Sequence, residues 1–143
     1  KWNPHTRETA DHSLPYVVAV SLVDGAVTSR QFSDDRLADP ALQAVTKSIE
    51  VVEDPDFTAA YPAAMPAHVE VHLANGTVES CAVEAPLGHG TRPMDEQAVH
   101  AKFVACGAQH RDSEQLEQMA AALLSLEAAP DVTEPMSTLA FAV

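Results

Sequence analysis

Apolar and polar residues alternate most clearly between positions 67 and 84 of this chain. The alternating residues are Val69, Val71 and Leu73 on one side and His68, Glu70 and His72 on the other. Alternation with period 2 places the apolar side chains on one face of a strand. The dipeptide Asn75-Gly76 supplies the positive φ angles of a tight turn. The segment is therefore predicted to be a β-hairpin whose second arm runs over about 77–84.

Four other segments carry the spacing and the end signals of helices. The first is predicted to begin between Ser13 and Tyr16, with Pro15 in the first turn, where its missing N–H costs nothing. Gly25 supplies its C-terminal stop. The other three are a short helix over 40–47, a helix over 95–106 capped near Asp95, and a Leu-rich helix that begins at Asp112 or Ser113.

The middle of the chain completes the predicted fold. We expect a third strand over 49–54, ended by Pro55, and a loop over the proline-rich stretch 55–66. Strands thus cluster in the middle and helices flank them, which predicts an α+β fold. The expected architecture is one domain over 1–143, a small antiparallel sheet with helices packed on one face. The chain opens within an apparent loop and without Met, so we expect it to be a piece of a longer polypeptide.

The composition narrows the possible functions. With 21 acidic and 8 basic residues the net charge is −13, which disfavours binding to nucleic acid. No window of 18 apolar residues exists, so no membrane span is expected. Cys81 and Cys106 have neither metal spacing nor a disulfide framework. We interpret them as small core residues of a cytoplasmic protein.

The stretch TRETADHSLPYVVAVSLVDG places polar groups directly before the first helix. Ser13 can cap that helix, and His12 and Tyr16 lie near its N-terminus, where N–H groups and a partial positive charge attract anions. In so acidic a protein this is a plausible place for a carboxylate. The alternative is an ordinary helix cap, with His12 and Tyr16 packed over loops.

Two further groups are weaker candidates. The loop GHGTRP precedes a helix, and His89 and Arg92 add donors for an anion, although its glycines also fit an ordinary turn. His68, Glu70 and His72 share one strand face, as metal ligands could, but no third His or Cys completes a set. A solvated hairpin face is the preferred interpretation, so no metal site is predicted.

Three motifs occur in order in TRETADHSLPYVVAVSLVDG, PAHVEVHLANGTVES and PLGHGTRPMDEQAVHAKF. Together they resemble the C-terminal domain of the MmgE/PrpD family, which includes 2-methylcitrate dehydratase, cis-aconitate decarboxylase and iminodisuccinate epimerase. The resemblance implies an α+β lid domain of a two-domain enzyme, usually a dimer. It also implies a missing N-terminal helical domain that holds most catalytic groups, a small carboxylate substrate between the domains, and no required cofactor.

The resemblance also assigns roles to residues of this chain. Tyr16 matches the lid tyrosine and His12 supports it, so both are expected to be catalytic. Ser13, in the matching motif, is expected to bind substrate. Arg92 and His89 are also expected to bind it, as the donors of the glycine loop, but the resemblance transfers no catalytic role to them. Dehydration, decarboxylation and epimerisation stay open, as does a non-catalytic binding or dimerisation module. Tyr16→Phe should lower turnover and spare stability, unless the hydroxyl holds the helix start to the loop before it.

Overall fold

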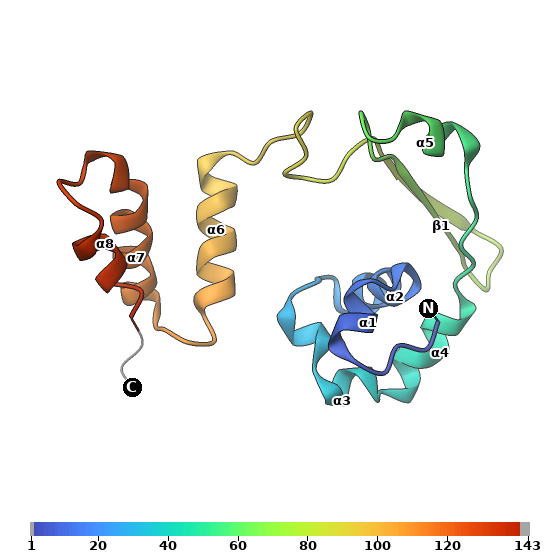
Figure 1. Ribbon diagram of the computed structural model, residues 1–143. Helices are drawn as coiled ribbons and strands as arrows, with labels where there is room; N and C mark the ends of the chain where they lie inside the picture. The colour runs from blue at the N-terminus through green and yellow to red at the C-terminus, as the bar shows by residue number, and fades with distance from the viewer. Residues whose placement is uncertain (1, 141–143) are drawn as a thin grey trace. The chain divides into compact units, whose positions relative to one another are not determined.

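The computed structural model describes residues 2–140 and groups the chain into two compact units, 1–63 and 64–143. The first unit is helical, and the second combines a two-stranded antiparallel sheet with helices. The predicted α+β class is confirmed. Figure 1 shows the helices and strands of each unit.

The first unit is built around helix α2. Its elements are α1 (Arg7–Asp11), α2 (Leu14–Asp24), the 3-10 turn η1 (Ser29–Phe32), α3 (Asp34–Leu37), α4 (Pro40–Ser48) and α5 (Pro55–Ala60). Helix α2 packs against α1 and α4. The buried core residues are Ala10, Tyr16, Ala19, Val20, Leu37 and Leu42, with Phe32, Val45 and Ile49 packed against them.

Local signals explain where the main helices of this unit begin and end. The Ser13 hydroxyl accepts the Tyr16 N–H at 3.3 Å, as an N-cap should, and Gly25 ends α2 with a φ of 69°. The Asp39 carboxylate accepts the Ala41 N–H at 2.8 Å and caps α4, whose first residue is Pro40. The predicted limits of both helices are confirmed.

The second unit contains the hairpin and the last helices. Its elements are β1 (Ala67–His72), β2 (Val78–Val83), α6 (Glu96–Gly107), α7 (Ser113–Leu124), the 3-10 turn η2 (Leu126–Ala128) and α8 (Thr133–Ser137). Val69 pairs with Cys81 and Val71 with Glu79, so the valines share a face as predicted. In the turn between the strands Gly76 has a positive φ, 86°, but Asn75 does not, so the prediction of a positive φ at both residues is wrong for Asn75. Helices α6 and α7 lie side by side (Figure 1). Within the described residues, neither strand has a helix among its main packing partners. That helices cover one face of the sheet therefore stays a prediction.

Two elements in the middle of the chain differ from the prediction. Within residues 2–140 the sheet has two strands, and 49–54 is irregular, with the Val52 side chain 76% exposed. An apolar run forms a strand only when another strand accepts its backbone hydrogen bonds, and none pairs with it here. The expected loop instead opens with α5, because Asp54 accepts the N–H groups of Asp56 and Phe57 and Pro55 occupies the first helical turn.

The prediction that both cysteines lie in the core is wrong, because Cys81 and Cys106 are exposed. Cys81 belongs to β2, whose residues are all exposed. Cys106 belongs to α6, which is described in full and has no buried residue. A small apolar residue at the right spacing is buried only if another element covers its face.

Among the helices within residues 2–140, none has both the length and the hydropathy that a membrane-crossing helix requires.

Candidate functional site

The start of α2 has fewer open backbone donors than the sequence suggested. Pro15 has no N–H, and the N–H of Tyr16 is bonded to the Ser13 hydroxyl. Ser13 is fully buried, so its side chain serves first as the helix cap. Binding of an anion at this helix end therefore has to depend mainly on neighbouring side chains.

The Tyr16 phenol is buried and hydrogen-bonded. The residue is 2% exposed, its ring centroid lies 5.9 Å from that of Phe32, and its hydroxyl donates to the backbone carbonyl of Gln31 at 2.6 Å. Burial, which disfavours the phenolate, raises the pKa of Tyr16, so the group stays protonated. The hydroxyl is thus bonded to the segment after α2, not to the loop before it.

An ionic network lies next to Tyr16 and was not predicted. The Gln31 side chain donates to Asp24 at 3.2 Å, and the Arg36 guanidinium forms two bonds with the same carboxylate, at 2.5 and 3.2 Å. Arg36 also pairs with Asp39. Hydrogen bonding from Arg36 lowers the pKa of Asp24, and the same bond raises the pKa of Arg36. The available signal was a single arginine among aspartates in the stretch DDRLAD.

His12 differs from Tyr16 and Ser13 in being open to solvent. It follows α1 as its C-cap, and its side chain is 88% exposed. Its Nδ1 lies 3.7 Å from a carboxylate oxygen of Asp11. His12, Ser13 and Tyr16 thus lie at the start of α2, and of the three His12 is the one exposed to solvent.

His89 and Arg92 belong to the second unit, in the loop before α6. The N–H of Thr91 donates to Nδ1 of His89 at 3.2 Å, so that nitrogen is an acceptor and the proton of a neutral ring lies on Nε2. Backbone bonds between Gly88 and Arg92 and between Arg92 and His89, each 2.8 Å, hold the loop as a tight turn.

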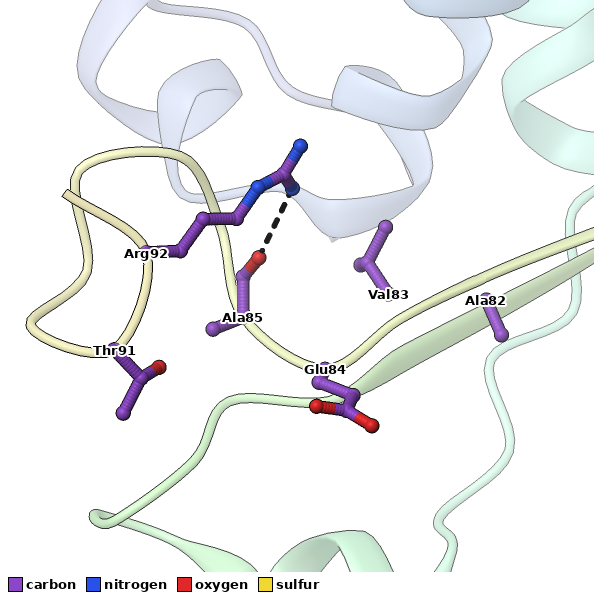
Figure 2. Close-up of a pocket in the computed structure, with 6 residues that line it drawn as sticks. All are labelled: Ala82, Val83, Glu84, Ala85, Thr91 and Arg92. Atoms are coloured by element: carbon purple, nitrogen blue, oxygen red, sulfur yellow. Dashed lines mark hydrogen bonds between the residues drawn. The ribbon is translucent and has the colours of Figure 1, made fainter. Parts of the chain in front are cut away.

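Arg92 lines an open hollow of about 390 Å³ at the end of the hairpin (Figure 2). Its guanidinium donates to the carbonyl of Ala85 at 3.2 Å, as the dashed line in Figure 2 shows. The Glu84 carboxylate points away from that guanidinium in the same view. Because a guanidinium carries five N–H donors, one such bond leaves Arg92 able to bind a carboxylate.

The residues considered for a metal site do not form one. His72 Nε2 lies 3.3 Å from the Glu70 carboxylate on the exposed face of β1. Nowhere in the described range 2–140 do three or more His, Cys, Asp or Glu side chains group as metal ligands.

The sequence of this chain matches a known protein family and several known proteins. The family model of the MmgE/PrpD C-terminal domain matches residues 1–127. A 2-methylcitrate dehydratase of Cupriavidus necator is 41% identical over 95 residues, which cover 63% of this chain and 19% of that protein. The 2-methylcitrate dehydratase of Escherichia coli (strain K12) is 34% identical over 98 residues, 65% of this chain and 20% of that protein.

The chain also matches a protein named as a decarboxylase, over about the same share of that protein's length. The cis-aconitate decarboxylase of Mus musculus is 24% identical over 100 residues, 70% of this chain and 20% of that protein. The chain therefore spans about a fifth of the length of the curated relatives it matches.

Proposed function

The chain belongs to the MmgE/PrpD family as its C-terminal domain, and on that premise we propose that it is part of a lyase acting on a small di- or tricarboxylate. The observation that supports this most is the family match over residues 1–127, together with relatives named 2-methylcitrate dehydratase and cis-aconitate decarboxylase. The reaction would remove a proton next to a carboxylate and expel water or carbon dioxide.

Within this proposal the groups at the start of α2 act on the substrate. His12 is an exposed titratable side chain there, beside Asp11, and would move or hold a proton, which general acid–base catalysis requires within hydrogen-bond reach of the substrate. Tyr16 would orient the substrate through its hydroxyl, and Ser13 would hold the helix start that carries both. His89 Nε2–H and the Arg92 guanidinium are donors suited to a substrate carboxylate.

The remaining parts of the proposal concern the whole protein. They are an N-terminal helical domain that holds most catalytic groups, a homodimeric assembly, independence of any cofactor and a cytoplasmic location. The length of the relatives supports the first of these alone, since about four fifths of each lies outside the aligned segment.

An activity screen of the longer protein that contains this chain tests the proposal. Purified protein is incubated with 2-methylcitrate, cis-aconitate and iminodisuccinate, and products are followed by chromatography and mass spectrometry. Dehydration or decarboxylation is the expected result. Interconversion of stereoisomers alone would replace the lyase with an epimerase, and no turnover of any acid would leave a binding or dimerisation module.

A pair of histidine variants then tests the site. His12→Gln in the longer protein should lower kcat at least tenfold, because a positioned general acid or base contributes typically 10²–10⁴-fold. His68→Gln is the matched control, since His68 is exposed on β1. Equal rates for the two variants would remove His12 from the site.

A further inference from the structure

The hydroxyl of Tyr16 is bonded to the short turn η1, which the proposed function does not use. The acceptor is the backbone carbonyl of Gln31, 2.6 Å from the phenol oxygen. A hydroxyl has one proton to donate and lone pairs that accept. The position of that carbonyl therefore decides where the Tyr16 proton points and which lone pairs stay open.

The Gln31 side chain holds this carbonyl in place. Its Oε1 accepts the N–H of Thr28 at 3.0 Å and the hydroxyl of Thr28 at 2.7 Å, which closes the start of η1. Its Nε2 donates to Asp24 at 3.2 Å. We call Thr28, Gln31, Asp24 and Arg36 the strap, because their bonds tie the segment after α2 back to the end of that helix.

Ion pairs hold the residues of the strap in place. Asp24 is bound by Arg36 through two hydrogen bonds, and Arg36 also pairs with Asp39, which caps α4. The side chains of Asp24 and Arg36 are only 20% and 22% exposed. Partly buried bidentate pairs of this kind fix geometry better than exposed ones. The strap therefore connects the Gln31 carbonyl to the ends of two helices.

We propose that Gln31 is a positioning residue for Tyr16, because its side chain, held by Thr28 and Asp24, fixes the carbonyl that receives the Tyr16 proton. This inference rests on the proposed function, in which Tyr16 meets the substrate. Gln31 itself touches no substrate. Its effect is to hold the phenol in one orientation, with the proton transferable only when the bond to Gln31 opens.

A double-mutant cycle in the longer protein tests the inference. Gln31→Ala should lower kcat about three- to tenfold with little change in KM, because a loosened phenol still binds but is wrongly oriented. In a Tyr16→Phe background the same substitution should leave kcat unchanged, since no hydroxyl is left to orient. A merely structural role would lower kcat equally in both backgrounds, and that result would overturn the inference.

Two further variants show whether the effect of Gln31→Ala is specific to the bond with Tyr16. Gln43→Ala is the control, because Gln43 is also half-buried and also donates to a backbone carbonyl, that of Leu37 at 2.9 Å, without contacting Tyr16. It should leave kcat unchanged. If Gln31→Ala fails to fold, Gln31→Glu replaces it, since that residue keeps acceptors for Thr28 and meets Asp24 with a like charge.

A second readout does not depend on activity. In the 143-residue chain carrying Tyr61→Phe, Tyr16 is the remaining tyrosine, and its ionisation can be followed by absorbance at alkaline pH. Gln31→Ala should lower the pKa of Tyr16 toward the ordinary tyrosine value, and Gln43→Ala should not. An unchanged titration refutes the positioning role whatever the enzyme does. Failure of the proposed function would be seen in other measurements. Either the wild-type protein would show no turnover, or Tyr16→Phe would leave kcat unchanged.

Discussion

At the scale of single residues, Tyr16 combines a packing role with a polar one. Its ring belongs to the core of the first unit and contacts Phe32, while its hydroxyl bonds to the Gln31 carbonyl. Because this hydrogen bond is partly buried, the hydroxyl contributes to stability independently of any substrate.

The bond to Gln31 changes the expectation from the sequence that Tyr16→Phe spares stability. The substitution should lower the free energy of unfolding of the 143-residue chain by about 1–3 kcal/mol, the usual effect of leaving a polar group unpaired away from water. Denaturant unfolding followed by circular dichroism measures this. Tyr61→Phe is the control, because Tyr61 is 66% exposed and should change stability by less than about 0.5 kcal/mol. An equal effect of both substitutions would show that the bond to Gln31 does not stabilise the fold.

Asp24 should make the stability of the chain depend on pH in the acid range. Arg36 lowers the pKa of Asp24 in the folded state, so the unfolded state binds more protons as the pH falls. The contribution is present above the ordinary carboxyl pKa of about 4 and is lost as the pH falls through the lowered value.

Asp24→Asn tests this linkage. Its unfolding midpoint should lie below that of the wild type at pH 7, and the difference should shrink toward about pH 2. Asp35→Asn is the control, because Asp35 lies on α3 like Arg36 but does not belong to the strap. A difference that stays constant with pH would exclude Asp24 as the source.

At the scale of elements, aspartate repeatedly caps the N-terminus of a helix. The helices α4, α5, α6 and α7 each begin after an aspartate whose carboxylate accepts backbone N–H groups: Asp39, Asp54, Asp95 and Asp112. A negative charge at a helix N-terminus also interacts favourably with the helix dipole. Part of the acidic character of the chain therefore reflects how its helices begin and is no evidence about its ligand.

The contact between α6 and α7 depends on a glycine. A Cβ added at Gly107 would lie 2.2 Å from Cδ2 of Leu116, a residue that is 2% exposed. Gly107→Ala should therefore lower the free energy of unfolding by about 1–3 kcal/mol, as overpacking does. Gly90→Ala is the control, since no atom lies within 4 Å of its added Cβ.

Leu116→Ala separates the clash from other effects of the Gly107 change. In that background the added methyl group has room, so Gly107→Ala should cost less than in the wild type. Thermal unfolding of the four variants measures the coupling. Additive effects would mean that α6 and α7 do not pack through this pair.

At the scale of the whole molecule, large apolar side chains are exposed in both units. Those of the first unit include Leu14, Leu22, Val23 and Val52, which are 51–76% exposed. In the longer protein proposed here, domain interfaces commonly bury on the order of 600–1,500 Å². Exposed apolar residues on a piece of such a protein are expected to find another partner.

We therefore expect the 143-residue chain to self-associate as its concentration rises, which sedimentation equilibrium measures. Replacing Leu22 and Val23 by Gln should weaken the association, because both lie exposed at the end of α2. A chain that stays monomeric at all concentrations would contradict this expectation and would weigh against the docking of a further domain.

The isolated chain should also lack dehydratase, decarboxylase and epimerase activity. Its candidate groups are one phenol and a few histidines and arginines, while Lys47 and Lys102 lie on α4 and α6. Assays of the purified chain, alongside the longer protein as a positive control, measure this. Turnover by the chain alone would place the whole catalytic machinery within these 143 residues.

Features that depend on neighbours in the sequence could be predicted from it. The limits of α2, the register of the hairpin through Asn75-Gly76, and the capped starts of α6 and α7 follow from local backbone preferences and side-chain periods, which act over a few residues. The family follows from the same motifs, because they are contiguous stretches.

Features that depend on distant partners required the tertiary structure. The run at 49–54 has the composition of a strand but no strand beside it, and Cys81 and Cys106 have core-like spacing but no covering element. The bond from Tyr16 to Gln31 and the pairing of Arg36 with Asp24 join residues 15 and 12 positions apart. Only the folded chain decides such contacts, because the hydrogen bonds and buried area that stabilise them exist only once packing has brought those segments together.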